Sequence, residues 1–149
     1  MQIRALDAHR RVVFAGEAVK HQDYHCFECN EPVRLRSGMQ RQAHFYHIRP
    51  NGACRLHSKG LPHLMLQYHL LDLLPKGEAE IECRFDTIGR IADVAWHPRR
   101  LIYEIQCSPI RPQEIIERNR DYASMGYQVI WILHENRYNK YRLSAAENA

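Results

Sequence analysis

The hydrophobic pattern of the chain changes its period near residue 61. Before that point, the alternating runs "IRAL" (residues 3–6) and "RVVFA" (residues 11–15) predict two short strands joined by the turn "DAHR". After it, apolar residues recur at close to helical spacing through "LPHLMLQYHLLDLL" (residues 61–74). Pro62 suits the first turn of that helix, and another proline follows its last apolar residue. The pattern therefore predicts a strand-rich N-terminal segment and then a helix.

Strand and helix patterns alternate over the rest of the chain. Runs of period two predict strands, and a helical pattern after Pro112 stops at Gly126, which suits a C-cap. The predicted elements are strands at 78–85, 88–96 and 100–108, a helix at 113–125, a strand at 127–135 and an edge strand at 138–144. From residue 61 to residue 134 the order is helix, three strands, helix and strand.

The hairpin around "HPRR" places two acids on one face. With that turn, residues whose numbers sum to about 197 lie opposite each other, so Asp93 faces Glu104 and Gln106 shares the Glu104 face. Facing carboxylates repel each other unless a cation neutralises them. A hydrated Mg²⁺ or Mn²⁺ does so, and it could activate water for attack on a phosphodiester. The alternative is a solvated hairpin face on which Glu104 pairs with Arg99, Arg100 or Arg118.

Composition narrows the class of protein. The chain has 149 residues, of which 45% are hydrophobic and 26% charged, as in a globular domain with room for a small appended module. A net charge of +4 leans toward anionic partners. The longest apolar runs are too short to span a bilayer, and the N-terminus lacks the apolar core of a signal peptide. We therefore expect a cytoplasmic protein without a membrane span.

Residues 24–57 are rich in metal-binding side chains and contain too little aliphatic material to fold by burial alone. The cysteines and histidines with ligand spacing are Cys26, Cys29, His44, His47, Cys54 and His57. A tetrahedral zinc ion needs four of them, and two histidines three apart on a strand point to opposite faces. The preferred set is Cys26, Cys29, His47 and Cys54, with His44 as the substitute for either of the last two. The alternative is free thiols beside histidines that line a basic surface.

Several motifs resemble those of the CoiA-like competence proteins, within the PD-(D/E)xK nuclease superfamily. They are "RIADVAW", "YEIQCSPI" and "IIERNRDYASMGYQVIWIL", with "CFECNEPV" and "HFYH" upstream. The resemblance implies an α+β fold with an α/β-type mixed sheet, in which a restriction-endonuclease-like αβββαβ core follows a small N-terminal zinc-binding β module. It implies that Asp93 and Glu104 bind Mg²⁺ or Mn²⁺. It also implies that Gln106, where the superfamily has lysine and CoiA-like proteins generally have glutamine, orients water or contacts phosphate.

Further residues are auxiliary candidates. His63 and Gln67 lie one turn apart where relatives carry a histidine and then a lysine, so His63 is expected to approach the acids. Arg118 and Tyr122 share a face of the second helix and are expected to aim at the acids or at a phosphate. A basic surface that suits the DNA backbone is formed by Arg34, Arg36, Arg41 and Arg49. Ordinary packing, local ion pairs and a plain solvated surface are the alternatives.

Two domains are expected: a module of strands and zinc ligands at residues 1–58, and a nuclease-like domain at residues 59–149. The predicted function is that of an Mg²⁺- or Mn²⁺-dependent endo- or exodeoxyribonuclease with a structural zinc ion. It would act on DNA during uptake, transformation or recombination, with uptake or recombination proteins as further partners. One alternative is an adaptor with a weak or inactive nuclease site that binds single-stranded DNA or a recombination partner. Another is a structural zinc protein that recruits proteins only.

Overall fold

A computed structural model gives the structure of the chain and describes residues 1–49, 51–57, 59–135, 138, 140 and 142–149. The described residues form a mixed α+β fold with two β-sheets and two α-helices, as predicted. The chain divides into two compact units, Met1–Met65 and Leu66–Ala149. The predicted domain boundary between residues 58 and 59 stays a prediction.

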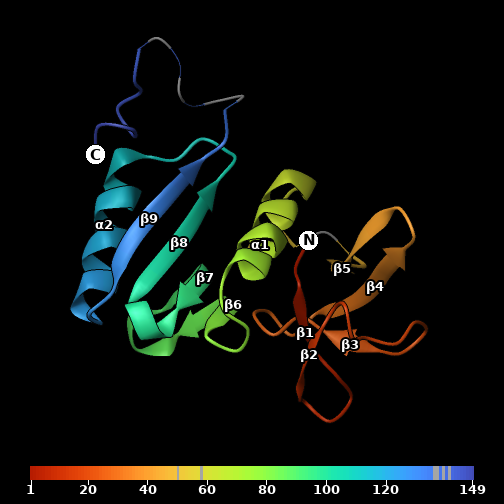
Figure 1. The fold of residues 1–149 in the computed structure, drawn as a ribbon. Helices are drawn as coiled ribbons and strands as arrows, with labels where there is room; N and C mark the ends of the chain where they lie inside the picture. Colours follow the sequence, from red (N-terminus) through yellow and green to blue (C-terminus); the bar gives the residue numbers. More distant parts are fainter. Residues whose placement is uncertain (50, 58, 136–137, 139, 141) are drawn as a thin grey trace. The chain divides into compact units, whose positions relative to one another are not determined.

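The first unit is built on a five-stranded antiparallel sheet with the strand order β2-β1-β3-β4-β5 (Figure 1). The strands are β1 (Arg4–Leu6), β2 (Val12–Phe14), β3 (Tyr24–His25), β4 (Pro32–Gly38) and β5 (Arg41–His47). Its core is small: the Tyr24 and Phe45 rings pack with centroids 4.9 Å apart, and aliphatic residues such as Ile3 are also buried. A core of this size leaves room for a metal to contribute to stability.

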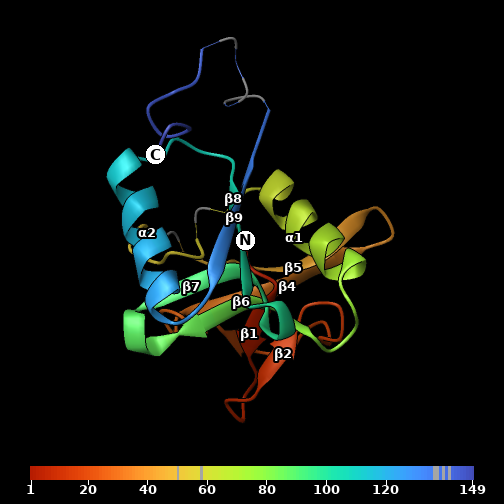
Figure 2. The same cartoon turned by 60° about the vertical axis from the view of Figure 1, so that its left-hand side comes forward.

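The second unit contains a four-stranded sheet and one helix packed on it. The helices are α1 (Leu61–Leu73), which begins in the first unit, and α2 (Pro112–Ser124). The strands are β6 (Ala79–Phe85), β7 (Arg90–Trp96), β8 (Leu101–Gln106) and β9 (Gln128–Leu133), in the order β6-β7-β8-β9. The first two pairings are antiparallel, whereas β8 and β9 run parallel, with α2 as the crossover between them (Figure 2). From residue 61 to residue 134 the predicted order of elements is confirmed.

Aromatic rings hold α2 against this sheet. The ring of Phe85 packs edge-on against Tyr122 and Tyr127, with centroids 5.6 and 5.2 Å away. The small side chains of Ala92 and Ala95 on β7 belong to the same core cluster, and they leave space for the rings. This packing fixes which residues of α2 face the sheet, and Tyr122 is one of them.

One predicted element is wrong. Among the described residues of segment 138–144 no strand forms, and residues 139 and 141 lie outside the description. Tyr138 is buried instead, and its hydroxyl donates to the carbonyl of Ser108 at 2.7 Å. A buried anchor of this kind outweighs a weak alternating pattern, so β9 is an edge of the sheet. No helix of the described residues is long and apolar enough to cross a bilayer.

Candidate functional site

The β7–β8 hairpin carries the two predicted acids. Its register is the predicted one. Val94 pairs with Tyr103, and the residue numbers of this pair and of the next two pairs toward the turn sum to 197. The ladder stops before Asp93, whose Oδ2 accepts a hydrogen bond from the Ile105 amide at 2.8 Å. Asp93 is 5% exposed and Glu104 is 2% exposed. The two acids therefore do not form a ladder pair, and they belong to a buried site instead of a solvated hairpin face.

Two side chains of α2 bind the Glu104 carboxylate. Arg118 Nη1 donates to Oε2 at 2.8 Å, and the Tyr122 hydroxyl donates to Oε1 at 2.7 Å. Burial opposes the charge of Arg118, but Glu104 and Glu114 raise the pKa of its guanidinium above the usual value. Burial and the charge of Glu104 raise the pKa of Tyr122, so its hydroxyl stays a neutral donor. Glu104 is thus a buried acceptor with a donor on each oxygen.

The ion pair of Glu104 is one end of a longer charge network. Arg118 Nε also donates to Glu114 Oε1 at 2.8 Å, and Arg90 Nη1 from β7 donates to the same oxygen at 2.9 Å. Arg90 Nη2 in turn lies 2.8 Å from Asp121 Oδ2. Alternating charges therefore connect β7, α2 and β8. The sequence predicted that Arg118 and Tyr122 approach the hairpin acids, and both contact Glu104. It did not predict the contribution of Arg90, which depends on how β7 and α2 pack.

The other predicted active-site residues lie in different surroundings. Gln106 ends β8, and its Nε2 donates to the Ser108 carbonyl at 2.6 Å. Gln67 of α1 is fully buried, and its Nε2 donates to the Asp93 carbonyl at 3.2 Å. His63 is buried one turn earlier, in the part of α1 that belongs to the first unit. The structure thus brings Gln67 to Asp93, and the predicted approach of His63 to the acids stays a prediction.

Glu82 is a third buried acid, which sequence reasoning missed. It is 0% exposed and lies on β6 between the pairs Ile81–Val94 and Cys83–Ala92, so it stands opposite Asp93. Its backbone is left-handed, with φ at 50°. The acids of "EAEIECRF" alternate as on a solvated strand face, so the sequence pattern points away from burial. The signal that could have found Glu82 is its register position opposite Asp93.

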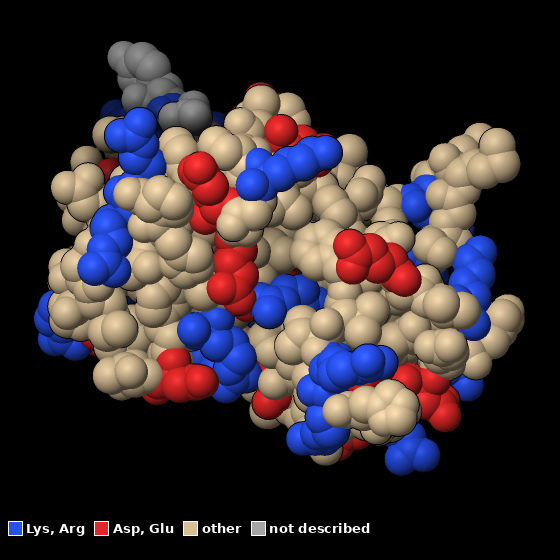
Figure 3. All heavy atoms as spheres, turned by 60° about the horizontal axis from the view of Figure 1, so that its bottom comes forward, with Lys and Arg blue, Asp and Glu red and all other residues tan. Residues whose placement is uncertain are grey.

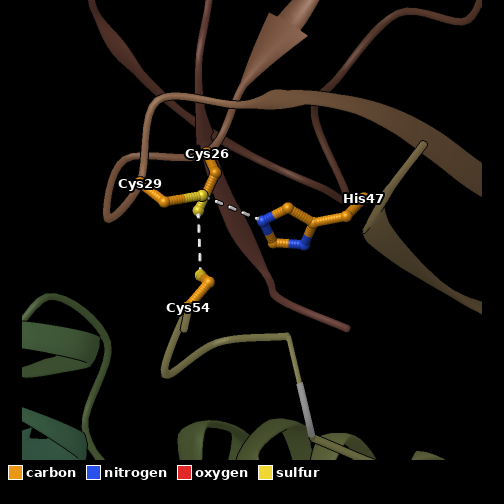
Figure 4. Close-up of side chains that lie close together, drawn as sticks. All are labelled: Cys26, Cys29, His47 and Cys54. Carbon is orange, nitrogen blue, oxygen red and sulfur yellow. Dashed lines mark hydrogen bonds between the residues drawn. The ribbon is translucent and has the colours of Figure 1, made fainter. Parts of the chain in front are cut away.

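Three cysteines and a histidine of the first unit meet in one cluster (Figure 4). Cys26 and Cys29 lie on the turn after β3, His47 ends β5, and Cys54 comes from the loop that follows. The turn is closed by Asn30, whose left-handed backbone amide (φ 61°) donates to the Cys26 carbonyl at 2.8 Å. The four ligand atoms lie within 4.8 Å of one another, so the cluster could hold a metal such as zinc.

The dimensions and chemistry of this cluster fit zinc. Tetrahedral ligands at usual zinc bond lengths lie about 3.8 Å apart for two sulfurs and about 3.6 Å apart for sulfur and nitrogen. The Sγ atoms of Cys26 and Cys54 are 3.7 Å apart, and Cys29 Sγ lies 3.2 Å from His47 Nε2. Burial raises the pKa of Cys26 to about 12 and lowers the pKa of His47. The imidazole is therefore a neutral ligand at neutral pH, and the thiols have protons to exchange for a metal.

His44 takes no part in the cluster. It lies on β5 three residues before His47, so the two side chains leave opposite faces of the strand. A ring nitrogen of His44, Nδ1, lies 2.8 Å from the Gln42 carbonyl, and burial lowers the pKa of His44. The imidazole of His57 instead packs edge-on against His47, with centroids 5.2 Å apart. The structure thus brings together the preferred set of four and leaves the substitute outside.

The four arginines of the predicted basic surface are exposed. Arg34 and Arg36 leave the same face of β4, and the Arg36 guanidinium lies 4.4 Å from the Tyr46 ring centroid. Arg41 begins β5, and Arg49 follows its end. On the face of the molecule drawn in Figure 3, basic and acidic side chains are intermixed. A role of these arginines in DNA binding stays a prediction.

Two family models match the chain. The model described as competence protein CoiA, nuclease-like domain, matches residues 60–148, and the one described as competence protein CoiA, N-terminal domain, matches residues 9–57. No curated protein and no solved structure matches the chain. The hairpin acids, Gln106 and the α2 donors all lie within the nuclease-like match, and the Cys₃His cluster lies within the N-terminal match. Because the nuclease-like match alone covers more than half of the sequence, the chain belongs to the CoiA competence protein family.

Proposed function

We propose that this protein hydrolyses DNA phosphodiesters with the help of Mg²⁺ or Mn²⁺, as an endo- or exodeoxyribonuclease. The observation that carries the proposal is the placement of two buried carboxylates, Asp93 and Glu104, on adjacent strands of a nuclease-like domain of the CoiA family. A family of competence proteins makes DNA processing during uptake or recombination the natural setting. Uptake or recombination proteins would then be further partners.

Each of the predicted site residues has a role in the proposed hydrolysis. The carboxylates of Asp93 and Glu104 are the hard oxygen donors that Mg²⁺ and Mn²⁺ prefer. A bound ion would supply positive charge at the phosphate and lower the pKa of a water molecule. The Gln106 amide would turn from Ser108 to orient that water or a phosphate oxygen. The superfamily uses lysine at this position, and here Arg118 is the nearby cation that can stabilise developing negative charge.

Specific contacts favour an alternative, in which the domain binds DNA as an adaptor without cutting it. Both oxygens of Glu104 accept hydrogen bonds from α2, and Gln106 is held by Ser108. Such an adaptor would bind single-stranded DNA or a recombination partner.

DNA cleavage assays separate the two functions. The full chain is incubated with Mn²⁺ or Mg²⁺ and single-stranded, duplex or branched DNA, beside Glu104→Ala and the exposed-acid control Asp72→Ala. We expect cleavage by the wild type and the control, and none by Glu104→Ala. A second variant, Gln106→Ala, changes a half-exposed side chain with local bonds, so it should fold and cut more slowly. DNA binding without cleavage by the wild type would reject the nuclease and favour the adaptor, and neither activity would favour a structural zinc protein.

We also propose that the Cys₃His cluster holds a structural zinc ion. Four protein ligands close the coordination sphere, which leaves no position for catalysis and ties β3, β5 and the following loop together. The test is the zinc content of the full chain purified without chelator. We expect His44→Ala to keep the zinc and Cys29→Ser to lose it. Protein with less than about half an equivalent of zinc would contradict the assignment.

A further inference from the structure

A second cluster of metal-binding side chains lies in the second unit. Glu80 and Cys83 come from β6, and His97 comes from the 3₁₀ turn after β7, His97–Arg99. Their three ligand atoms lie within 4.8 Å of one another. His97 Nε2 is 3.4 Å from Glu80 Oε2 and 4.0 Å from Cys83 Sγ. The cluster shares no residue with the Cys₃His cluster or with the hairpin acids.

An unusual backbone position brings two of these ligands to one side of β6. Residues three apart on a regular strand point to opposite faces, so Glu80 and Cys83 would normally diverge. Glu82 lies between them with φ at 50°, while the pairing with β7 keeps the same register on both sides. A left-handed non-glycine residue is strained, and such residues concentrate at functional sites. Here the distortion has a visible result, because it lets both side chains reach His97.

The imidazole of His97 is oriented by the core. Its Nδ1 lies 2.8 Å from the hydroxyl of Tyr127, and the two rings meet edge-on. Tyr127 is itself buried and packs against Phe85. This leaves Nε2 directed at Glu80 and Cys83. A metal-binding histidine usually has its second nitrogen hydrogen-bonded in this way, which fixes the ring and its tautomer.

We propose that Glu80, Cys83 and His97 form a second metal site, which takes a borderline-soft divalent ion such as Zn²⁺. A tetrahedral zinc ion at usual bond lengths needs about 3.4 Å between nitrogen and oxygen and about 3.6 Å between sulfur and nitrogen. The first spacing is met at 3.4 Å, and the second, at 4.0 Å, is longer than needed, so Cys83 Sγ would have to move toward the ion. A thiolate and an imidazole favour Zn²⁺ over Mg²⁺, so this ion would differ from the one at the hairpin acids.

The surroundings of the cluster fit an open, exchangeable site. Cys83 is 5% exposed, whereas the side chains of Glu80 and His97 are 42% and 41% exposed. The three protein side chains would therefore bind the ion on one side, and a water molecule from the solvent would be its fourth ligand. With one protein ligand fewer and two half-exposed ligands, this ion should be lost to a chelator before the ion of the Cys₃His cluster. The ion would fasten the edge strand β6 to the turn after β7, independently of whether the domain cuts DNA.

Metal stoichiometry tests the proposal on the full chain. We expect the wild type to bind two equivalents of Zn²⁺ or Co²⁺ by titration, with the weaker one removed first by a mild chelator. His97→Ala and Glu80→Gln should each bind one, and the controls His69→Ala and Cys107→Ser, which change a histidine and a cysteine outside both clusters, should bind two. A wild type whose single equivalent is kept by His97→Ala and Glu80→Gln, or variants that still bind two, would overturn the proposal.

Two further readouts locate the weaker ion. Trp96 precedes His97 in the chain, so Co²⁺ at this site should quench its fluorescence, and His97→Ala should abolish the quenching. Tyr127→Phe removes the hydrogen bond to His97 Nδ1 and should weaken binding of the second equivalent by about 10- to 100-fold. Glu80→Gln changes a half-exposed side chain, so it stays informative if a core variant fails to fold. Unchanged quenching in both His97→Ala and Glu80→Gln would reject the site.

Discussion

Removal of the Arg118 guanidinium is expected to destabilise the second unit by about 3 kcal/mol. Arg118 Nη1 lies 2.8 Å from Oε2 of Glu104, which is 2% exposed. Removing one partner of a buried ion pair leaves an uncompensated charge and costs about 3–5 kcal/mol. The Arg118 side chain is 29% exposed, so solvent screens part of the interaction and the lower end of that range applies. Tyr122 still donates to the other oxygen in Arg118→Ala.

A second substitution shows whether the cost comes from a buried charge. Glu104→Gln removes the charge and keeps the shape of the side chain, so it should cost less than Arg118→Ala. In the double variant no carboxylate is left without its cation. We therefore expect the loss in free energy of unfolding of the double variant to be about 2 kcal/mol smaller than the sum of the losses in the two single variants. The exposed neighbour Arg120, 76% exposed, supplies a control, because Arg120→Ala should stay within about 0.5 kcal/mol of the wild type.

Tryptophan fluorescence measures this unit alone. The chain has two tryptophans, Trp96 and Trp131, and both lie in Leu66–Ala149. Trp131 Nε1 donates to Asn119 of α2 at 2.9 Å, so its emission reports on whether that helix is docked. Urea unfolding of the wild type, the two single variants, the double variant and the Arg120→Ala control then gives the free energies of unfolding and the coupling between Arg118 and Glu104. Strictly additive costs, or an Arg118→Ala protein as stable as the control, would refute a buried charged pair.

Three further outcomes are expected. Tyr122→Phe removes the hydroxyl that lies 2.7 Å from Glu104 and should lower the free energy of unfolding by about 1.5–3 kcal/mol, measured with urea. Removal of zinc with a chelator should unfold the Met1–Met65 unit, while the emission of the tryptophans, which lie in the other unit, stays native. The control His44→Ala changes a histidine outside the cluster and should hold zinc as the wild type does. Burial raises the pKa of Cys26 to about 12, so below that pH zinc must displace a proton, and its apparent affinity should rise by about tenfold or more per pH unit in a competition titration.

The order of elements was predictable because its signals are local. Helical spacing over 61–74 and alternation in the next three segments each report on side chains a few residues apart, and α1, β6, β7 and β8 formed there. The predicted strand at 138–144 had only weak alternation to support it. Whether a segment joins a sheet depends on a partner strand, and the burial of Tyr138 beneath its hydrogen bond to Ser108 is a tertiary contact. Local patterns hold no information about such a contact.

At the candidate sites, too, local sequence patterns predicted some features and missed others. Turn chemistry predicted the register of the hairpin, and strand alternation separated His44 from His47. Sequence patterns did not reveal the left-handed backbone of Glu82, because the acids around it alternate as on a solvated strand. This one distorted residue matters twice. Glu82 is itself the third buried acid opposite Asp93, and its left-handed backbone brings the side chains of the second cluster together.

Glu104 connects stability with the proposed activity. Its carboxylate is held by Arg118 and Tyr122, so an ion that binds it must compete with a charged hydrogen bond already made. If α2 releases Oε2 when metal and DNA arrive, Nη1 of Arg118 can turn to the phosphate while Nε stays paired with Glu114, and the guanidinium would take the role that lysine has in the superfamily. If α2 keeps both oxygens, the same contacts make a rigid domain that binds DNA without cutting it. The family relationship is compatible with both outcomes, so we expect the strength of the Arg118 and Tyr122 hydrogen bonds to Glu104 to decide between nuclease and adaptor.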